Sequence, residues 1–247
     1  MRHAFSDDSP TMRAVAAGFS EIRPKLLIVE GFPTIMGEDP PPLVQEAHHH
    51  GARDADDYAR GEAMFAASLA LKQAVPFVGG EPDRAEQIDA LKAKGFTDAD
   101  IAFNAMAGEF SQALRSGDMP DTSAASLLKA YPRLAERLVA PLDRGGWVQT
   151  APSLDAFRQR YRELYGVDIS GDRQFPLRID VVYDKTRNGE LQRAAGIIRD
   201  RHLLGLIEQQ LSEKRAVLVV YGSSHWSTVS AALEQRLGKP DVRPFLK

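Results

Sequence analysis

The chain has 247 residues, a formal net charge of -3 and no cysteine. Its length suits one large domain or two small ones, and 43% hydrophobic with 26% charged residues is an ordinary globular balance. The near-neutral charge gives no electrostatic reason to expect nucleic acid as a partner. The absence of cysteine excludes disulfides, thiolate metal sites, iron–sulfur clusters and cysteine nucleophiles.

The first eighty residues predict short apolar strands that alternate with helices. Apolar residues recur every three or four positions over Pro10–Ile22, which predicts a helix. A continuously apolar strand follows at 26–29, as expected for a central strand of a parallel sheet. Helices over 43–50 and about 58–74 lead to a second short strand at 75–78.

The middle of the chain, residues 83–166, shows helices and turns but no convincing strand. Thr97 with Asp100 is typical of a helix N-terminus, and further helices are expected over 123–139 and 153–165. We therefore expect one α/β domain over residues 1–247 that carries a helical cap or insertion at 83–166.

The last third returns to the α/β pattern. It predicts a strand at 176–182, a long helix over 186–211, and a strand at 216–220 that is the most apolar and is expected to be the most buried. A final helix extends to about Leu237. The predicted fold is α/β, with a mainly parallel central sheet flanked by helices.

Polar residues follow three of the predicted strands. Glu30 follows the first strand, Glu81 the second, and His225 the last one. Each residue alone could equally be a solvated turn residue, a helix cap or a structural histidine. Because the carboxyl ends of parallel strands open into a common crevice, we expect the three to share one site, with Glu81 on the substrate side.

Several neighbouring residues could complete that site. Gly222 allows a sharp turn before His225, and the serines at positions 223 and 224 can cap the following helix, with Ser223 also facing substrate. Tyr221 could supply a hydroxyl donor. Arg187 could clamp a carboxylate or a developing oxyanion, or it could simply pair with a nearby acidic residue. A partly dry site, with Trp226 limiting water, would keep His225 neutral.

The remaining histidines look less informative. His48, His49 and His50 are adjacent, so on a helix they point in different directions and cannot converge on one metal ion. His202 lies among Arg199, Asp200 and Arg201, which we interpret as a solvated helix face.

Common catalytic motifs are missing from the sequence. It contains no G-x-S-x-G elbow, no H-E-x-x-H, no phosphate-binding G-x-x-x-x-G-K-[ST] loop and no dinucleotide fingerprint. These absences disfavour a serine hydrolase of the α/β-hydrolase type, a zincin and a nucleotide-binding enzyme.

Four segments together resemble the superfamily of TraB/GumN, Tiki, erythromycin-esterase and ChaN-like proteins. Residues 27–31, Leu-Ile-Val-Glu-Gly, are similar to the glutamate motif of that superfamily, and Arg187-Asn188 to its arginine motif. Residues 219–225 are similar to its second G-x-x-H motif, and Met1-Arg2-His3 to the last three residues of the first. The glycine of that first motif, and the strand before it, would lie upstream of Met1, so we expect the native sequence to begin earlier.

The resemblance implies a hydrolase similar to a metal-dependent protease or to an esterase. His3, Glu30, Arg187 and His225 would be catalytic, and His3, Glu30 and His225 would bind a divalent ion such as Mn, Co or Zn if the enzyme uses one. The ChaN-like relatives instead imply a non-enzymatic protein that binds haem, and a degenerate interaction-only member is a third alternative.

The substrate would be a small molecule or a peptide, and whether the chain forms a homo-oligomer is left open. The resemblance favours a periplasmic or membrane-anchored native form over a cytoplasmic one, because many relatives are exported or anchored.

Overall fold

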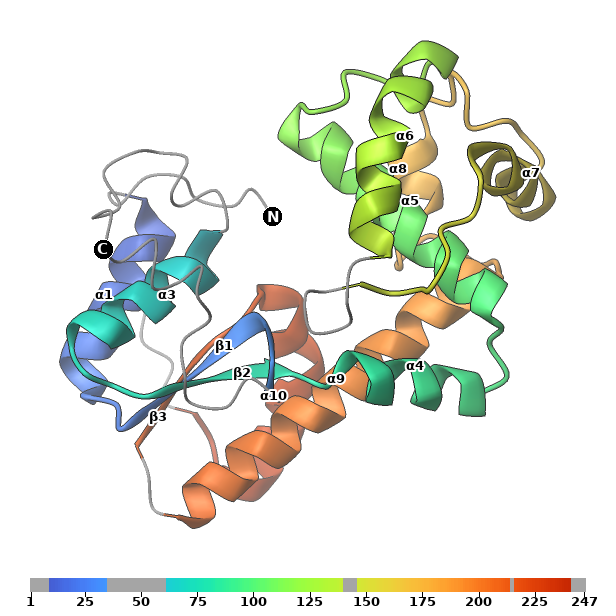
Figure 1. The fold of residues 1–247 in the computed structure, drawn as a ribbon. Helices are drawn as coiled ribbons and strands as arrows, with labels where there is room; N and C mark the ends of the chain where they lie inside the picture. Colours follow the sequence, from blue (N-terminus) through green and yellow to red (C-terminus); the bar gives the residue numbers. More distant parts are fainter. Residues whose placement is uncertain (1–8, 35–60, 140–145, 214–215, 241–247) are drawn as a thin grey trace. The chain divides into compact units, whose positions relative to one another are not determined.

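A computed structural model describes residues 9–34, 61–139, 146–213 and 216–240 (Figure 1). The chain forms two compact units. We call Met1–Pro82 with Arg199–Lys247 the sheet unit, and Asp83–Ile198 the helical unit. The helical unit begins where the insertion was predicted to begin, but it continues to Ile198 instead of ending near residue 166.

The sheet unit is built on three parallel strands. They are β1 (Leu26–Pro33), β2 (Phe77–Glu81) and β3 (Val217–Val220), in the order β2-β1-β3. The predicted α/β class, with a parallel sheet flanked by helices, is therefore confirmed. Because all three strands run in the same direction, their carboxyl ends lie at one edge of the sheet.

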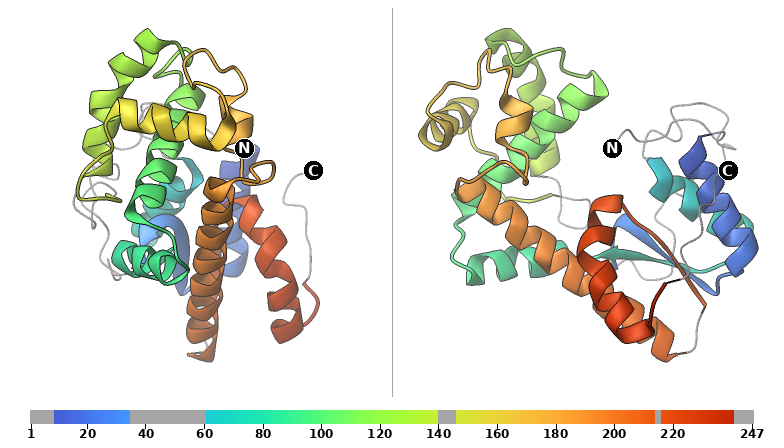
Figure 2. Two further views of the ribbon diagram at one scale, coloured as in Figure 1. Left: turned by 90° about the vertical axis from the view of Figure 1, so that its right-hand side faces the viewer. Right: turned by 180° about the vertical axis from the view of Figure 1, so that it is seen from behind.

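Helices α1 (Pro10–Ile22) and α3 (Gly61–Lys72) cover one face of this sheet (Figures 1 and 2). Leu27 and Val29 of β1 point to this face and are fully buried there. At Gly18, α1 approaches β3 so closely that an added Cβ would lie 3.3 Å from a methyl carbon of Leu218. The expected helix over Pro10–Ile22 is confirmed at both ends.

The opposite face of the sheet is covered by α9 (Arg187–Ser212) and α10 (Ser223–Leu237). Leu26 and Ile28 of β1 point to this face, as the two-residue period of a strand requires. The buried side chains that α9 contributes are Leu203, Leu206 and Ile207. The C-terminal half of α9 is thus fixed against the sheet by an apolar stripe with helical spacing.

Strand β3 is less buried than its sequence suggests. Its residues, Val-Leu-Val-Val, were predicted to form the most buried strand, but all four are only half-buried. Among the described residues β3 pairs with β1 alone, with Val219 opposite Ile28. An edge strand is covered by a neighbour on one side only, and this accounts for the difference.

The described part of the helical unit contains helices and turns but no strand. Its helices, besides the first part of α9, are α4 (Arg84–Ala93), α5 (Asp98–Ser116), α6 (Ala124–Leu138), α7 (Leu154–Tyr165) and α8 (Phe175–Arg178). The predicted cap of α5 is present, because the side chains and backbone amides of Thr97 and Asp100 form a reciprocal capping box. Ser123 and Ser153 cap α6 and α7 in the same region where helices were expected.

The strand predicted at 176–182 is wrong. Phe175–Arg178 forms the short helix α8, and a turn follows in which the Asp180 side chain accepts the backbone N–H of Val182 at 2.8 Å. Pro176 stands in the first turn of α8, where a missing N–H is tolerated. Within this segment Leu177 and Val182 are 58% and 64% exposed, whereas Ile179 is buried.

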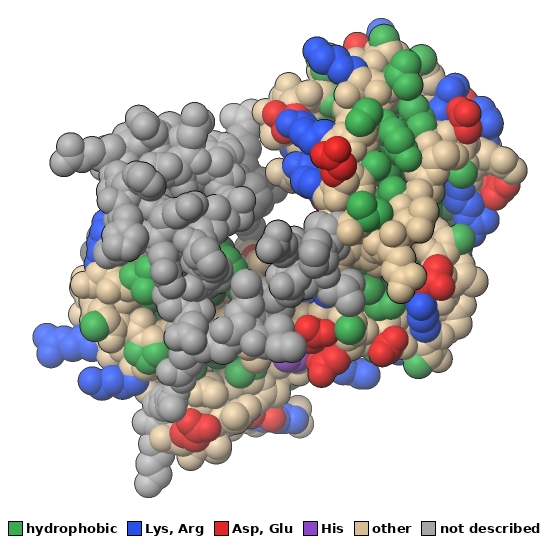
Figure 3. Space-filling view, in the orientation of Figure 1, with side chains coloured by type: hydrophobic (Ala, Val, Ile, Leu, Met, Phe, Trp, Pro, Cys, Tyr) green, Lys and Arg blue, Asp and Glu red, His purple; other side chains and the backbone are tan. Residues whose placement is uncertain are grey.

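An aromatic and aliphatic core holds the helical unit together. Phe103, Met106 and Phe110 lie three and four positions apart on α5, are buried, and pack with Phe157 and Tyr161 of α7. Figure 3 shows further hydrophobic side chains at the visible surface of this unit, between charged ones.

No helix within the described ranges is long and apolar enough to cross a membrane. Two predictions lie outside those ranges: the helix over 43–50 with its three histidines, and the position of His3.

Candidate functional site

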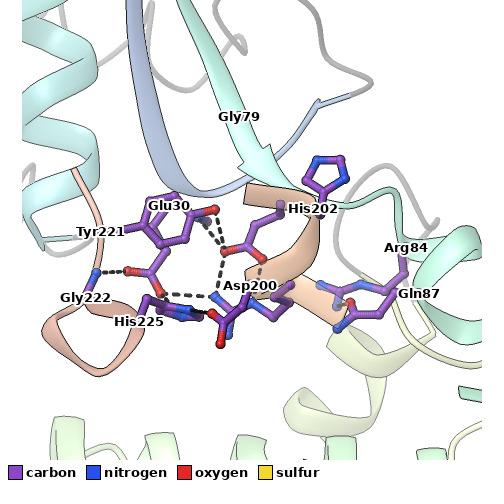
Figure 4. Close-up of polar contacts among 12 residues, drawn as sticks. Glu30, Gly79, Arg84, Gln87, Asp200, His202, Tyr221, Gly222 and His225 are labelled. Carbon is purple, nitrogen blue, oxygen red and sulfur yellow. Dashed lines mark hydrogen bonds and ion pairs between the residues drawn. The ribbon is translucent and has the colours of Figure 1, made fainter. Parts of the chain in front are cut away.

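A cluster of ionisable side chains lies at the carboxyl ends of the three strands (Figure 4). Glu30 lies in β1 directly after the residues that pair with β3, Glu81 ends β2, and β3 leads through Tyr221 and Gly222 to His225. Helix α9 contributes Arg199 and Asp200 from the face that it packs on the sheet. We call these five charged or titratable residues, Glu30, Glu81, Arg199, Asp200 and His225, the strand-end cluster.

Glu30 is at the centre of the strand-end cluster. Its Oε2 accepts the backbone N–H of Gly222 at 2.7 Å, and its Oε1 accepts a hydrogen bond from Arg199 at 3.1 Å. Gly222 permits this close approach, since a Cβ there would lie 3.1 Å from Oε2. Burial alone would raise the pKa of Glu30, but the hydrogen bonds from His225 and Gly222 and the charge of Arg199 outweigh it and lower the pKa to about 2.

The imidazole of His225 lies between two carboxylates. Its Nδ1 is 2.6 Å from Oδ1 of Asp200, and its Nε2 is 3.5 Å from Oε1 of Glu30. The hydrogen bond with Glu30 is the main factor that raises the pKa of His225; burial opposes it and the contact with Asp200 adds to it. The structure thus brings Glu30 and His225 together, as predicted from their positions after apolar strands.

Two details around His225 differ from the prediction. A dry site was expected to keep the imidazole neutral, but the two carboxylates favour the protonated form instead. Trp226 was expected to limit water, yet its side chain is 52% exposed while His225 is 8% exposed. Consecutive residues on a helix point about 100° apart, so burial of His225 does not bury its neighbour.

Arg199, rather than Arg187, is the arginine of the strand-end cluster. Two of its nitrogens lie 2.6 Å from the two carboxylate oxygens of Glu81, a bidentate pair that also contacts Glu30. The pKa of Arg199 is raised, because these hydrogen bonds and charges outweigh the cost of burial.

Arg187 has its described contacts inside the helical unit. It donates to the carbonyl of Gly95 at 2.6 Å, stacks over the ring of Phe96 and pairs with Glu190. Pairing with Glu190 is the alternative that the sequence left open for this residue.

The residues on α9 that the sequence analysis interpreted as a solvated face are mostly not solvated. Arg199 and Asp200 belong to the strand-end cluster, and Nε2 of His202 lies 2.6 Å from the hydroxyl of Thr34. A signal was present, because Arg199 and Asp200 precede the buried Leu203 by four and three positions and therefore lie on its side of the helix. The run of charged residues at 199–201 obscures this helical period in the sequence.

The residues predicted to face substrate take different places. The hydroxyl of Tyr221 lies 3.5 Å from Glu81, and its ring packs on Gly80, where a Cβ would come within 2.3 Å of the hydroxyl oxygen. Burial and the charge of Glu81 raise the pKa of Tyr221. Ser223 is exposed and is the first residue of α10, whose N-cap is Gly222, so the predicted serine cap is not formed.

A divalent metal ion would find only part of a ligand set here. Nε2 of His225 and Oε1 of Glu30 lie 3.5 Å apart and could bind one ion, while Asp200 holds Nδ1 as carboxylates commonly do for metal-bound histidines. Arg199, however, already contacts the same Oε1, and an ion would have to displace it. Among the described residues no group of three or more His, Asp or Glu side chains is arranged to hold a metal ion, and the third predicted ligand, His3, lies outside them.

Two surface hollows occur away from the strand-end cluster. One, of about 310 Å³, lies in the sheet unit beside Arg23, Lys25 and Gln73, near the amino ends of the strands. The other, of about 460 Å³, lies in the helical unit beside Met119, Lys129 and Arg133. Neither contains an imidazole or a carboxylate cluster, so the chemistry points to the strand ends.

The chain matches no family model, no curated protein and no solved structure. The resemblance to the TraB/GumN, Tiki, erythromycin-esterase and ChaN-like superfamily therefore rests on the sequence motifs alone. Any function must be argued from the strand-end cluster itself.

Proposed function

We propose that the protein is a hydrolase in which His225 takes a proton from the attacking water molecule. The observation that carries this proposal is the placement of the His225 imidazole 3.5 Å from Glu30 at the carboxyl edge of a parallel sheet. Ligands of open α/β sheets bind at this edge, and an imidazole is the side chain best suited to proton transfer near neutral pH.

The different basicities of Glu30 and His225 assign them different roles in the proposed reaction. The pKa of Glu30 is lowered to about 2, whereas the hydrogen bond with Glu30 raises the pKa of His225 above its usual value. Glu30 is thus a far weaker base than the imidazole, and it stays ionised at neutral pH. We assign proton transfer to His225, and we assign to Glu30 the stabilisation of the imidazolium that forms.

The proposed step balances without a further reactant. Water adds to the carbonyl carbon of an ester or amide while Nε2 of His225 accepts its proton. The imidazolium then gives this proton to the leaving oxygen or nitrogen as the bond to the carbonyl carbon breaks. The products are a carboxylic acid and an alcohol or amine, and His225 returns to its neutral form.

The same site can be tested for a metal-dependent form of this reaction. A divalent ion on Glu30 and His225, with His3 as the predicted third ligand, would lower the pKa of a bound water molecule. Arg199 would then have to release Glu30, because the guanidinium and the ion compete for the same carboxylate oxygen.

A panel of neutral esters, lactones and fluorogenic peptides tests the proposal. The wild-type chain should hydrolyse at least one class, and His225→Gln should reduce its turnover by at least about 100-fold. Glu21→Gln serves as the matched control, because Glu21 is an exposed carboxylate of the same unit, and it should leave turnover unchanged. Each assay is repeated with EDTA and with Mn²⁺, Co²⁺ or Zn²⁺ to decide whether a metal ion takes part.

The pH dependence gives a second test. A base must be deprotonated, so turnover should rise with pH through the raised pKa of His225. No hydrolysis of any class, combined with a Soret band on haem titration that is lost in His225→Gln, would replace the hydrolase with the haem-binding alternative.

A further inference from the structure

Asp200 and His225 form a close and largely buried contact. Oδ1 of Asp200 lies 2.6 Å from Nδ1 of His225, and the two side chains are 16% and 10% exposed. This is the shortest contact that either nitrogen of His225 makes to a carboxylate, since Glu30 lies 3.5 Å from Nε2. A carboxylate oxygen at this distance accepts a hydrogen bond from an N–H at Nδ1.

The two ring nitrogens of His225 therefore have different surroundings. Nδ1 faces Asp200, whereas Nε2 faces Glu30 at a longer distance (Figure 4). The ring of Tyr221 lies nearly perpendicular to the imidazole, with centroids 5.2 Å apart and an interplanar angle of 86°. These contacts fix both the plane of the imidazole and the direction in which each nitrogen points.

Asp200 can make this contact because α9 is held in one rotational position. Leu203, Leu206 and Ile207 pack on the sheet, and Arg199 immediately before Asp200 is held by Glu81. Adjacent residues on a helix diverge by about 100°, so Arg199 and Asp200 reach different partners from the same turn.

We propose that Asp200 is a positioning residue that keeps the proton of neutral His225 on Nδ1 and leaves Nε2 as its basic nitrogen. This inference rests on the proposed function for its catalytic consequence, because the proposed base is Nε2, the nitrogen that faces Glu30. It goes further than that function, since it states which nitrogen reacts and what sets that choice. From the sequence, Asp200 was expected only on a solvated face of the helix.

The charges around His225 agree with this arrangement. Glu30 on β1 and Asp200 on α9 stabilise its protonated form, the guanidinium of Arg199 opposes it, and Tyr221 contributes an aromatic edge. Free histidine favours the tautomer with its proton on Nε2, so a proton on Nδ1 requires a specific acceptor. Asp200 is the acceptor that the geometry supplies.

Nitrogen-15 NMR of histidine-labelled full-length chain reads the tautomer directly. The chain contains six histidines, so the signals of His225 are assigned by their loss in His225→Gln. In wild type, neutral His225 should carry its proton on Nδ1. In Asp200→Ala it should shift to the Nε2 tautomer, and its titration midpoint should fall because one of two carboxylates is gone.

Asp200→Asn separates geometry from charge. The amide oxygen can still accept from Nδ1, so the tautomer should be kept while the titration midpoint falls. This variant also keeps the test valid if Asp200→Ala does not fold. Glu208→Gln is the matched control, because Glu208 is a carboxylate of α9 that also pairs with α10, through Arg236, and it should change neither signal.

The outcomes are decisive whether or not a substrate is known. If His225 keeps the Nδ1 tautomer and its midpoint in folded Asp200→Ala, Asp200 does not position it and the inference is wrong, even if hydrolysis is observed. If the tautomer changes as expected but no hydrolysis is found, the positioning stands and the proposed function fails. With a substrate in hand, Asp200→Ala should lower kcat by about 10- to 100-fold with little change in KM.

Discussion

The sheet unit and the helical unit both contain a carboxylate that accepts several hydrogen bonds, but the donors differ in kind. In the helical unit, buried Asp184 accepts from the hydroxyls of Tyr165 and Thr186 and from the amide of Asn188, at 2.7 to 2.9 Å. In the sheet unit, Glu30 faces the guanidinium of Arg199 and the imidazole of His225.

This difference in donors distinguishes the hydrogen bonds around Asp184, which stabilise the fold, from the strand-end cluster, which can take part in proton transfer. The donors around Asp184 are neutral, and none of them changes protonation near pH 7. The strand-end cluster contains an imidazole and can exchange a proton with a ligand. Burial and hydrogen bonding are common to both clusters, and a guanidinium and an imidazole among the donors distinguish the strand-end cluster.

The largest expected effect is on turnover at His225. His225→Gln keeps a side chain that can hydrogen-bond but cannot act as a base near neutral pH. We expect turnover to fall by about 100- to 10,000-fold, the range for a positioned acid–base group. Initial rates are measured on the substrate class found in the panel, with the folded fraction determined by circular dichroism.

The melting temperature of the same His225→Gln sample must stay within a few degrees of wild type. A destabilised protein with normal turnover per folded molecule would show that His225 is structural, like the donors around Asp184.

Asp184→Ala is the reciprocal experiment in the helical unit. It leaves the donors of Tyr165, Thr186 and Asn188 without their shared acceptor, and an unsatisfied buried donor costs about 1–3 kcal/mol. We expect the free energy of unfolding to fall by about 3 kcal/mol in a denaturant titration. Turnover per folded molecule should not change, and a loss of turnover as large as that of His225→Gln would contradict the division of roles.

The two arginines provide a third contrast. Arg199→Gln leaves Glu81 and Glu30 without their cation, and we expect a loss of about 2 kcal/mol together with lower turnover, since hydrogen bonds to charged groups contribute about 1.5–3 kcal/mol. Arg187→Gln removes the pair with Glu190 and the contacts with Gly95 and Phe96, all made by a partly exposed side chain, and should cost about 1 kcal/mol, less than Arg199→Gln. Paired denaturant titrations and rate measurements on both variants test this order, and the reverse order would restore Arg187 as the functional arginine.

Two residues of the strand-end cluster, Glu30 and His225, could be predicted from the sequence. Glu30 and His225 each come just after a short apolar run, and the carboxyl ends of parallel strands meet by topology, so their proximity could be predicted without any contact information. The helices of the middle region were equally accessible, since Thr97, Ser123 and Ser153 mark their first turns.

The contribution of α9 was harder to predict. Which side of a helix faces a sheet depends on packing over its whole length, and the apolar stripe of α9 changes phase between its two halves. Ile197 is 48% exposed, whereas Leu203 and Leu206 are buried. The charged run at 199–201 therefore suggested a solvated face, although Arg199 and Asp200 lie on the buried side of the helix.

The smallest expected effect is the pH dependence of stability at His225. The folded pKa is raised above the usual 6.5 because Glu30 and Asp200 stabilise the imidazolium, so the folded state binds this proton more tightly than the unfolded state. The stabilisation is fully present below about pH 6.5 and is lost as pH rises through the folded pKa.

The free energy of unfolding of wild type should therefore decline over that pH range, while His225→Gln should lack this component. Urea titrations at closely spaced pH values measure the difference between the two curves, which cancels the histidines that both proteins share. A difference that grows with pH would mean that the imidazole is buried in its neutral form. Glu30 and Asp200 would then resemble Asp184, whose side-chain partners are neutral.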